Sequence, residues 1–544
     1  MKRINLLLSL VLLVLVCPLA EAQNYWVFLT DKEGVEFNPY EYFDQKAIER
    51  RLQHGLPLND ITDYPVNSNY IDIIQRIADS TGYVSRWFNA VAVVASRECI
   101  AAIEALPFVR RIEPSFTDGD FVLAEAKGSK YDTSLTPYKR ELIDAQTTIM
   151  GRAYFEEEGY DGKGIRIAIF DGGFPSWQHN PTFAHIRDDG RIIATYDFTK
   201  GKENVDRGVA HGTMVMSCIG GMIDGQPIGC ATGAEYMMAI TEIRREPFKE
   251  EQNWLAAMEW ADKGGADIIN SSLGYTADRY FNYQMDGRHT FVTRAANMAA
   301  AKGLLVVNAA GNEGFGVWHI VGAPADADSV LSIGGIHPKT GFHTSFSSYG
   351  PTADKRLKPN VVAFGHVVAA GKKKLSVTQG TSFASPLVAG FAACAWQTNP
   401  NLTNMQLFKE IEKSGNLYPY FDYAHGYGVP QADHFTKIGV NPPDTTFDII
   451  INDGHFSIVI RDQYVPENDT SKQINDLMNS YLYLHIRNRD EIIKTYHIIK
   501  VKEKDVFDSA LKKIRSSDDL SPLVLPKEKI CAHYRGYTLT IEMP

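Results

Sequence analysis

The chain has 544 residues, of which 44% are hydrophobic and 22% charged, and its formal net charge is -10. This length allows two to four domains, and the composition is ordinary for a folded globular protein. The acidic balance argues against nucleic acid as a partner, because a nucleic-acid-binding domain needs a basic surface.

The first residues predict export. Two basic residues precede an apolar run at 6–16, and Ala20 and Ala22 supply small residues at the cleavage positions. This is the pattern of a secretory signal peptide, and the run is too short to be a good membrane span. We expect residues 1–22 to be removed and the protein to reach the periplasm, the cell surface or the medium. No later stretch of the sequence is long and apolar enough to cross a membrane.

The remaining cysteines are sparse and widely spaced: Cys99, Cys218, Cys230, Cys394 and Cys531. Their spacing fits neither a zinc site nor a disulfide framework. Two alternatives stay open, a single bridge between Cys218 and Cys230, or buried free thiols.

The region 24–117 predicts a small α/β unit. Its pattern gives a strand, a helix, a strand pair or one long strand, a second helix and a final strand, at 25–29, 42–53, 83–94, 97–106 and 108–112. Residues 118–130 are mostly polar, charged and glycine-bearing, which is typical of a linker.

Past the linker, short apolar strands alternate with helix-length amphipathic runs. The expected strands are 165–170, 236–240, 267–270 and 304–307, and the expected helices are 139–157, 252–263, 288–302 and 404–413. Near-continuous apolar strands between helices indicate a parallel sheet covered on both faces, with ligands at the carboxyl ends of its strands. Beyond a boundary at 441–444 the chain turns β-rich, which predicts a small antiparallel sandwich.

A serine precedes the most apolar helix of the chain. The stretch 380–386, Gly-Thr-Ser-Phe-Ala-Ser-Pro, leads into a run at 387–396 that is apolar on every face, so that helix should be buried. Pro386 is expected in its first turn. Ser382 then lies at the helix N-terminus, where unpaired N–H groups suit an oxygen that becomes negative. A serine there could also serve only as a helix cap.

Three more polar residues follow or open predicted elements. Asp171 ends an apolar strand, His211 opens a second helix that looks buried, and Asn312 runs off the end of a strand. Each alone could be structural, as a turn aspartate, a satisfied histidine or a turn amide. Together with Ser382 they give the order Asp, His, Ser on an α/β scaffold, one of the known orders of a catalytic triad, with an amide that could stabilise an oxyanion.

The segments around these four residues resemble the signature blocks of the subtilisin-like serine peptidases, the S8 family, over residues 135–438. The resemblance implies an α/β fold of three layers with a mostly parallel sheet, and endopeptidase activity through an acyl-enzyme. It implies that Asp171 orients, that His211 is the general base and then the acid, that Ser382 is the nucleophile, and that Asn312 lies in the oxyanion hole.

The resemblance also extends to substrate binding. The stretch from Asn270 to Gly274 resembles the family's substrate-binding strand, so Ser272, Leu273 and Gly274 would line the primary pocket and Gly322 would lie at its floor. We place no acidic residue at that floor. This predicts a preference for large apolar or aromatic residues before the scissile bond.

Two departures from the family pattern stand out. Gly172 and Gly173 follow Asp171, where the family usually has Ser or Thr. The carboxylate must therefore be oriented by backbone N–H groups or a distant donor, and turnover should be modest. Arg244 and Arg245 lie where relatives have a neutral edge strand; we expect a solvated charge pair, the alternative being a preference for acidic residues away from the cleavage point.

The predicted organisation is a signal peptide at 1–22, a propeptide at 23–130, a peptidase domain at 131–440 and a β-rich domain of open role at 441–544. The propeptide should assist folding, then block the site, and be cut between Asp118 and Thr136; a permanent N-terminal binding domain is the alternative.

We expect protein or peptide substrates, the protein's own propeptide as partner, a monomer, and no cofactor in the chemistry. Structural calcium is common in the family, but its ligands come from scattered loops and cannot be assigned. The alternative function is a weakly active or inactive peptidase fold that serves as a scaffold; an esterase would lack the peptide-binding edge at Ser272 to Gly274.

Overall fold

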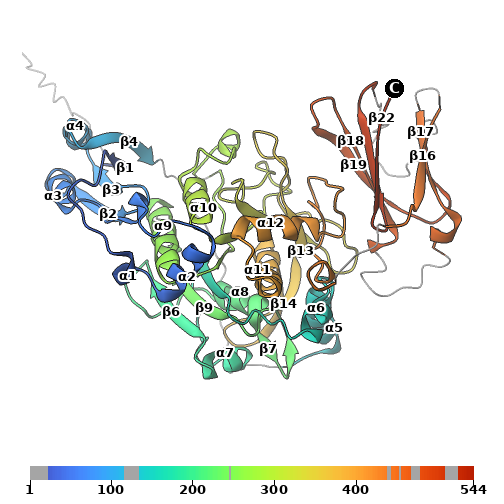
Figure 1. Cartoon of the computed structure of the whole chain (residues 1–544), viewed down its shortest axis with the longest axis horizontal. Helices are drawn as coiled ribbons and strands as arrows, with labels where there is room; N and C mark the ends of the chain where they lie inside the picture. Colours follow the sequence, from blue (N-terminus) through green and yellow to red (C-terminus); the bar gives the residue numbers. More distant parts are fainter. Residues whose placement is uncertain are drawn as a thin grey trace, which may run out of the picture. The chain divides into compact units, whose positions relative to one another are not determined.

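The structure, a computed structural model, describes residues 22–115, 134–243, 247–277, 279–437, 443–452, 455–466, 478–508 and 525–544. It divides into two units. The first comprises residues up to Phe37 together with Asp60–Phe116, and the second comprises Asn38–Asn59 together with all residues from Thr117 onward (Figure 1). The expected signal peptide, the linker and Arg244–Arg245 lie outside the described residues.

The first unit is the small α/β unit that the sequence predicts. Its antiparallel sheet has the order β2-β3-β1-β4, made of β1 (Gln23–Leu29), β2 (Ser80–Ser85), β3 (Ala90–Ala95) and β4 (Val109–Ser115). Helices α3 (Ser68–Ile77), which was not predicted, and α4 (Arg97–Glu104) bury Ile74 and Ile103 against Val27, Val91 and Val93 of the sheet.

The predicted helix at 42–53 is two helices, and both lie in the second unit. These are α1 (Pro39–Tyr42) and α2 (Gln45–Gln53). The break falls at Asp44, whose side chain accepts a hydrogen bond from Lys46 N and so caps α2.

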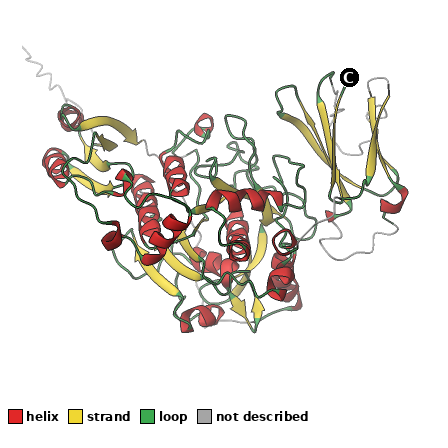
Figure 2. Cartoon of the chain, in the orientation of Figure 1, coloured by secondary structure: helices red, strands yellow, loops and turns green. Residues whose placement is uncertain are grey.

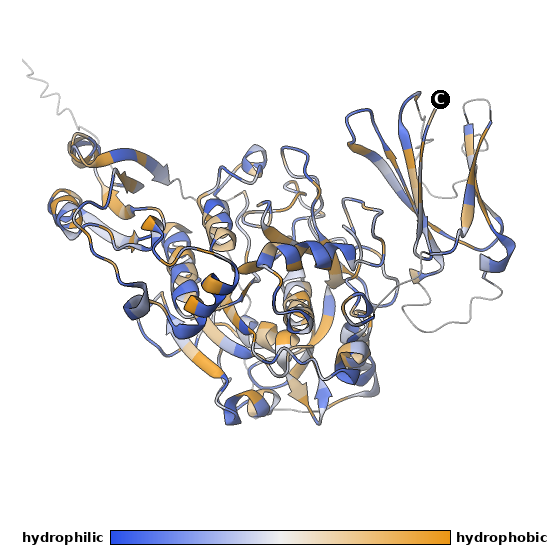
Figure 3. Cartoon of the chain, in the orientation of Figure 1, coloured by the Kyte–Doolittle hydropathy of each residue, from blue (hydrophilic) through white to orange (hydrophobic). Residues whose placement is uncertain are grey.

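The second unit is built on a seven-stranded parallel sheet of order β13-β12-β11-β10-β5-β9-β6. Its strands are β5 (Arg166–Asp171), β6 (Ile192–Asp197), β9 (Glu235–Ile240), β10 (Ile268–Ser271), β11 (Leu305–Ala309), β12 (Val330–Ile336) and β13 (Val361–Phe364). Figure 2 shows these strands between helices, and Figure 3 shows apolar stretches along them. The near-continuous burial of the strands is why the parallel sheet was predictable.

Helices cover both faces of this sheet. Side chains alternate along β5, so Ile167 and Ile169 face a core shared with α8 (His211–Gly220) and α11 (Thr381–Thr398), whereas Phe170 contacts Trp254 of α9 (Pro247–Lys263). Helix α10 (Phe291–Ala301) packs on α9. This is the three-layer α/β fold that the sequence predicts. Two further helices of eight or more residues occur in the described chain, α5 (Pro137–Thr148) and α12 (Asn404–Lys413). The predicted helix 139–157 is in fact two helices, α5 and α6 (Arg152–Glu157), divided at Gly151, whose φ is +74°.

The C-terminal residues form the predicted antiparallel sandwich. One sheet contains β16 (Phe447–Asn452), β17 (His455–Ile460) and β20 (Asp505–Asp508), and the other contains β18 (Tyr481–Arg487), β19 (Ile493–Lys500), β21 (Lys529–Tyr534) and β22 (Tyr537–Glu542). Both sheets contribute to one buried core. A second cluster joins Tyr483 and Cys531 of this sandwich to Leu417 and Tyr420 of the preceding region.

The five cysteines of the described chain are free thiols, so the bridge between Cys218 and Cys230 is wrong. Burial raises the pKa of each of these two thiols to about 12. Among the residues that the structure describes, no helix is long and apolar enough to span a membrane.

Candidate active site

The structure brings Asp171 and His211 together at the carboxyl edge of the sheet. Asp171 is the last residue of β5 and is 1% exposed, and His211 is the first residue of α8. The imidazole Nδ1 lies 2.8 Å from Oδ2 and 3.1 Å from Oδ1 of the carboxylate. Since a carboxylate only accepts hydrogen bonds, Nδ1 carries the proton and Nε2 is left as the free nitrogen.

The backbone N–H of Gly172 donates to Asp171 Oδ1 at 2.7 Å. The carboxylate is therefore oriented by a main-chain donor, as expected for a chain without Ser or Thr at the following position. A close approach of glycines holds α8 against this turn: a Cβ on Gly212 would lie 2.5 Å from Gly173 O and 2.9 Å from Asp171 Cβ. Helix α8 can bring His211 this close only because residue 212 has no side chain.

The pKa of His211 is raised above its ordinary value. Burial lowers the pKa, but the negative charge of Asp171 and the hydrogen bond to it outweigh that effect. The site therefore stabilises the imidazolium, which is the form that a general base produces when it takes a proton.

Ser382 is the second residue of α11 and is partly exposed. Gly380 precedes the helix with φ +140°, a backbone conformation that favours glycine. The sequence predicted Pro386 in the first turn, and this prediction is wrong: the residue lies further inside the helix. Its position has a consequence: proline has no N–H to donate to the carbonyl four residues earlier, which is that of Ser382.

The freed Ser382 carbonyl has another partner. Ser272 Oγ donates to it at 2.8 Å, and Ser382 Oγ in turn donates to Ser272 O at 3.2 Å. These two bonds join the start of α11 to the segment after β10. In the described part of the chain the Ser382 hydroxyl has this one hydrogen bond, and the ring of Phe383, the next residue, lies 5.4 Å from the His211 ring.

Asn312 is exposed and its amide is oriented by the start of α11. Its Oδ1 accepts hydrogen bonds from Thr381 N at 2.9 Å and Thr381 Oγ1 at 3.1 Å. A backbone N–H can only donate, so the oxygen must face Thr381 and Nδ2 remains available as a donor.

The expected substrate segment is open on one side. Gly274 is exposed, and a Cβ there would meet nothing within 4 Å, whereas Leu273 is partly buried and its carbonyl accepts from Asn308 Nδ2 at 3.0 Å. Tyr275 and Ala323 exchange backbone hydrogen bonds of 2.8 and 3.1 Å, which brings the segment after β10 to the loop of Gly322. Gly322 is buried, and a Cβ added there would lie only 2.9 Å from the side chain of Thr276.

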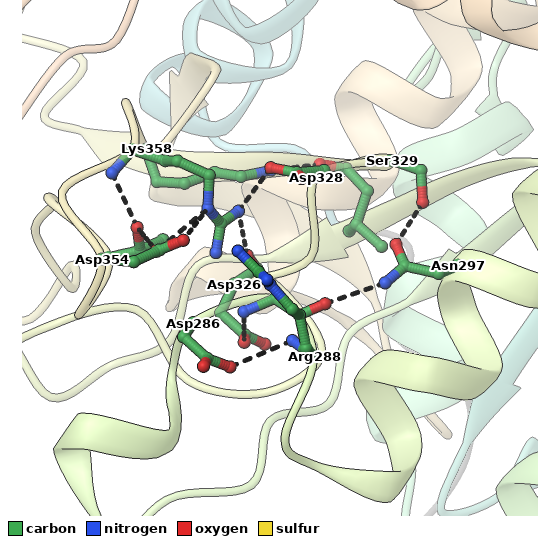
Figure 4. Close-up of polar contacts among 12 residues, drawn as sticks. Asp286, Arg288, Asn297, Asp326, Asp328, Ser329, Asp354 and Lys358 are labelled. Atoms are coloured by element: carbon green, nitrogen blue, oxygen red, sulfur yellow. Dashed lines mark hydrogen bonds and ion pairs between the residues drawn. The ribbon is translucent and has the colours of Figure 1, made fainter.

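The sequence analysis missed two acidic residues near this segment, the buried Asp326 and the half-buried Glu242. Burial raises the pKa of Asp326 to about 6; its carboxylate accepts from Thr293 Oγ1 at 2.6 Å and Gly287 N at 2.8 Å, within the network drawn in Figure 4. Glu242 follows β9 and accepts from the Tyr275 hydroxyl at 3.4 Å, and burial raises its pKa well above the usual range. Apart from Thr241, which donates to Glu242 at 3.0 Å, these hydrogen-bond partners lie 33 to 39 residues away in the sequence, so no local pattern indicates them.

In the described ranges, no group of three or more His, Cys, Asp or Glu side chains could hold a metal ion.

An aspartate–imidazole pair and a serine at a helix start, at the edge of a parallel α/β sheet, are the elements of a serine peptidase. Residues 162–428 match the model of the subtilase family, Peptidase S8, and residues 24–128 match the model of the Peptidase S8 propeptide domain of Bacteroidota. The chain belongs to the subtilase family of serine peptidases.

Several known proteins are similar to this chain. Subtilisin DY of Bacillus licheniformis is 27% identical over 292 residues, 53% of this chain and 95% of that protein. The minor extracellular protease Epr of Bacillus subtilis (strain 168) is 26% identical over 366 residues, 66% of this chain and 52% of that protein. A solved cold-adapted subtilisin-like serine proteinase is 22% identical with a TM-score of 0.40, covering 50% of this chain and 88% of that chain.

Proposed function

We propose that this protein is a secreted serine endopeptidase whose triad is Asp171, His211 and Ser382. The observation that carries the proposal is the hydrogen bond of 2.8 Å between Asp171 and His211, at the same sheet edge as the start of α11. The unprotonated Nε2 of His211 is then the base for the Ser382 hydroxyl.

The proposed reaction uses side chains, one backbone N–H group and water. Ser382 Oγ attacks the peptide carbonyl and its proton passes to His211 Nε2, while Asp171 holds the tautomer and balances the imidazolium charge. Ser382 N–H and Asn312 Nδ2 stabilise the oxyanion. The imidazolium gives its proton to the leaving amine, and a water molecule, deprotonated by His211, releases the acyl group and restores Ser382.

In the proposed reaction the Ser382 hydroxyl leaves Ser272 O and donates to His211 Nε2. Hydrogen bonds of catalytic groups are often long or misdirected without substrate. A weakly active or inactive scaffold on the same fold is the second candidate, favoured by the bond from Ser382 Oγ to Ser272 O.

We propose that the open edge at Gly274 takes an extended peptide as an added strand, with Ser272 and Leu273, and that Gly322 is the floor of the primary pocket. Large apolar or aromatic residues before the scissile bond are then preferred. A peptide-library profile dominated by Lys or Arg at that position would contradict this assignment.

Residues 23–130 are proposed to be a propeptide that assists folding and then blocks the cleft, after export directed by residues 1–22. The match to a propeptide model supports the first statement, and a relative named as an extracellular protease supports export. Parallel sheets form slowly because their contacts are non-local, so a tethered partner at high effective concentration favours folding.

One variant tests the core of the proposal. Ser382→Ala should lose about 10⁶-fold in turnover and should keep residues 23–130, whereas the native protein loses them. Hydrolysis of a denatured protein, labelling by a covalent serine reagent and N-terminal sequencing measure these outcomes. Full activity of Ser382→Ala would end the hypothesis, and identical N-termini near Gln23 in both proteins would exclude self-processing.

A further inference from the structure

A short part of the propeptide region is packed into the peptidase unit. Residues Asn38–Asn59, which carry α1 and α2, group with the peptidase and not with the four-stranded unit that precedes and follows them in the chain. They lie inside the stretch that matches the propeptide model. Their contacts therefore join the region expected to be removed to the region expected to remain.

Two consecutive arginines of α2 share one carboxylate of the peptidase. Arg50 binds Asp262 Oδ1, and Arg51 Nη2 lies 2.6 Å from Asp262 Oδ2. Arg50 is 4% exposed, and Arg51 and Asp262 are each 1% exposed. Arg50 also donates to the carbonyl of Ala266. Because a buried charge is strongly unfavourable without its partner, removal of either side of this group should weaken the contact severely.

A second set of contacts surrounds the buried group. Lys46 Nζ lies 2.8 Å from Asp267, and Arg166 Nη1 lies 3.2 Å from Asp44. The backbone N–H of Asp44 donates to Lys263 O at 2.8 Å. Charges of opposite sign thus meet along α2, which gives the contact its register.

The peptidase surface fits α2 closely through two glycines. Gly265, with φ +71°, lies where an added Cβ would be 2.9 Å from Ala47 N, and Gly303, with φ +90°, lies where it would be 3.0 Å from Leu56. Both glycines are in turns that precede strands, β10 and β11. Each supplies the positive φ of its turn and also the space for the incoming segment.

This surface is remote from the nucleophile. Asp262, Asp267 and Gly303 precede β10 or β11, so they lie at the amino edge of the sheet, whereas Asp171 and Ser382 lie at the carboxyl edge. Helix α11 connects the two edges: it begins beside Ser382, and Trp396 near its end stacks on His54 with ring centroids 6.0 Å apart. Eighteen helical residues span about 27 Å.

We propose that Asn38–Asn59 is a docking segment that binds the propeptide to the amino edge of the peptidase sheet, at a site apart from the active site. The inference rests on the proposed function of residues 23–130. A cut between Asp118 and Thr136 breaks the covalent link but none of these contacts, because they join residues 44–51 to residues 166 and 262–267, far from the cut. Release of the propeptide is then a step separate from cleavage, and it requires the arginines to leave Asp262.

The experiment uses a chain that cannot cleave itself. In a full-length Ser382→Ala chain, a recognition site for a sequence-specific protease is inserted between residues 118 and 130, and the folded protein is cut with that protease. Size-exclusion chromatography and surface-immobilised binding then measure whether the N-terminal fragment stays with the peptidase. The native fragment should remain bound.

The Arg50→Ala, Arg51→Ala double variant should bind at least about 100-fold more weakly. Arg76→Ala, an exposed arginine on α3, is the matched control and should bind as the native fragment does. Asp262→Asn tests the same contact from the peptidase side, and keeps the test decisive if the double variant does not fold.

Equal affinity of the native, double and Asp262→Asn proteins would overturn the proposal, as would immediate loss of the native fragment after the cut. If the proposed function is wrong, the protein that keeps Ser382 will be inactive and will not cut itself, whatever the binding measurements give.

Discussion

At the scale of single residues, the proposed role of the Asp171–His211 pair predicts how activity depends on pH. In the proposed reaction His211 acts as a base only when it is neutral, and its pKa is raised above the ordinary 6.5 by Asp171. A raised pKa keeps the imidazole charged to higher pH, so kcat/KM should fall as pH drops, with a midpoint above 6.5. A pH profile of kcat/KM measures this. An acid limb with its midpoint clearly below 6.5 would show that Asp171 does not act on the titrating group.

Asn312 offers a second test at this scale. Its free Nδ2 is proposed to bind the oxyanion only in the transition state, so Asn312→Ala should lower kcat by about 10²–10³-fold with little change in KM. Thr381→Val is the comparison: it removes the hydroxyl that binds Asn312 Oδ1 but keeps the backbone N–H bond, and should cost much less. Equal losses in the two variants would mean that Asn312 matters through the start of α11 and not through its own donor.

The residue types of the site were predictable because the chemistry restricts them. The sequence pattern alone puts these residues at the ends of predicted strands or the starts of predicted helices, and so predicts that they lie at one edge of a parallel sheet: Asp171, His211, Asn312 and Ser382. The partner of the Ser382 hydroxyl was not predictable, because Ser272 lies 110 residues away. The expected position of Pro386, in the first turn of its helix, was wrong, because Ser272 Oγ from another segment satisfies the carbonyl that proline leaves without its helical donor.

At the scale of elements, the contact of α8 with β5 depends on Gly212. A methyl group there would press on Gly173 O and Asp171 Cβ, and would move His211 relative to its carboxylate. Because a displacement of about 1 Å can cost about 10²-fold, Gly212→Ala should lower kcat/KM on that order.

Gly371→Ala is the control for this variant, because an added Cβ there meets nothing closer than 3.5 Å. Native kcat/KM in a folded Gly212→Ala protein would contradict the close fit. Thermal unfolding, followed in parallel, separates misplacement of His211 from loss of the fold.

Elements differ in how well the sequence predicts them. The buried strands β5, β9, β10 and β11 were predicted because they are nearly continuous apolar runs between helices. Strands β6, β12 and β13 and helix α3 were missed; β6 mixes polar with apolar residues, and β12 contains two glycines. The break between α1 and α2 depends on a cap at Asp44 within an otherwise helical pattern.

At the scale of the whole molecule, the C-terminal sandwich is joined to the region before it by buried aromatic rings. Tyr483 is 2% exposed, and its ring lies 5.9 Å from that of Tyr420. Truncation of a buried aromatic residue costs about 3–5 kcal/mol, so Tyr483→Ala should lower the stability of both regions if they unfold together.

Tryptophan fluorescence can measure that coupling, since all seven tryptophans lie at or before Trp396 and report on the chain outside the sandwich. Ile450→Ala, at an exposed position of β16, is the control and should leave the midpoint of unfolding unchanged. An unchanged midpoint in Tyr483→Ala would show that the sandwich unfolds independently.

The placement of the thiols determines how the protein responds to oxidants. The thiolate is the form that exchanges with disulfides, and burial raises the pKa of Cys218, Cys230, Cys394 and Cys531 above the ordinary value, so these side chains stay protonated and shielded. Among the described cysteines only Cys99 is partly exposed, and it lies in the stretch that matches the propeptide model. Without that stretch, the cysteines that the structure describes offer no exposed thiol that air oxidation could use to cross-link the protein to its neighbours.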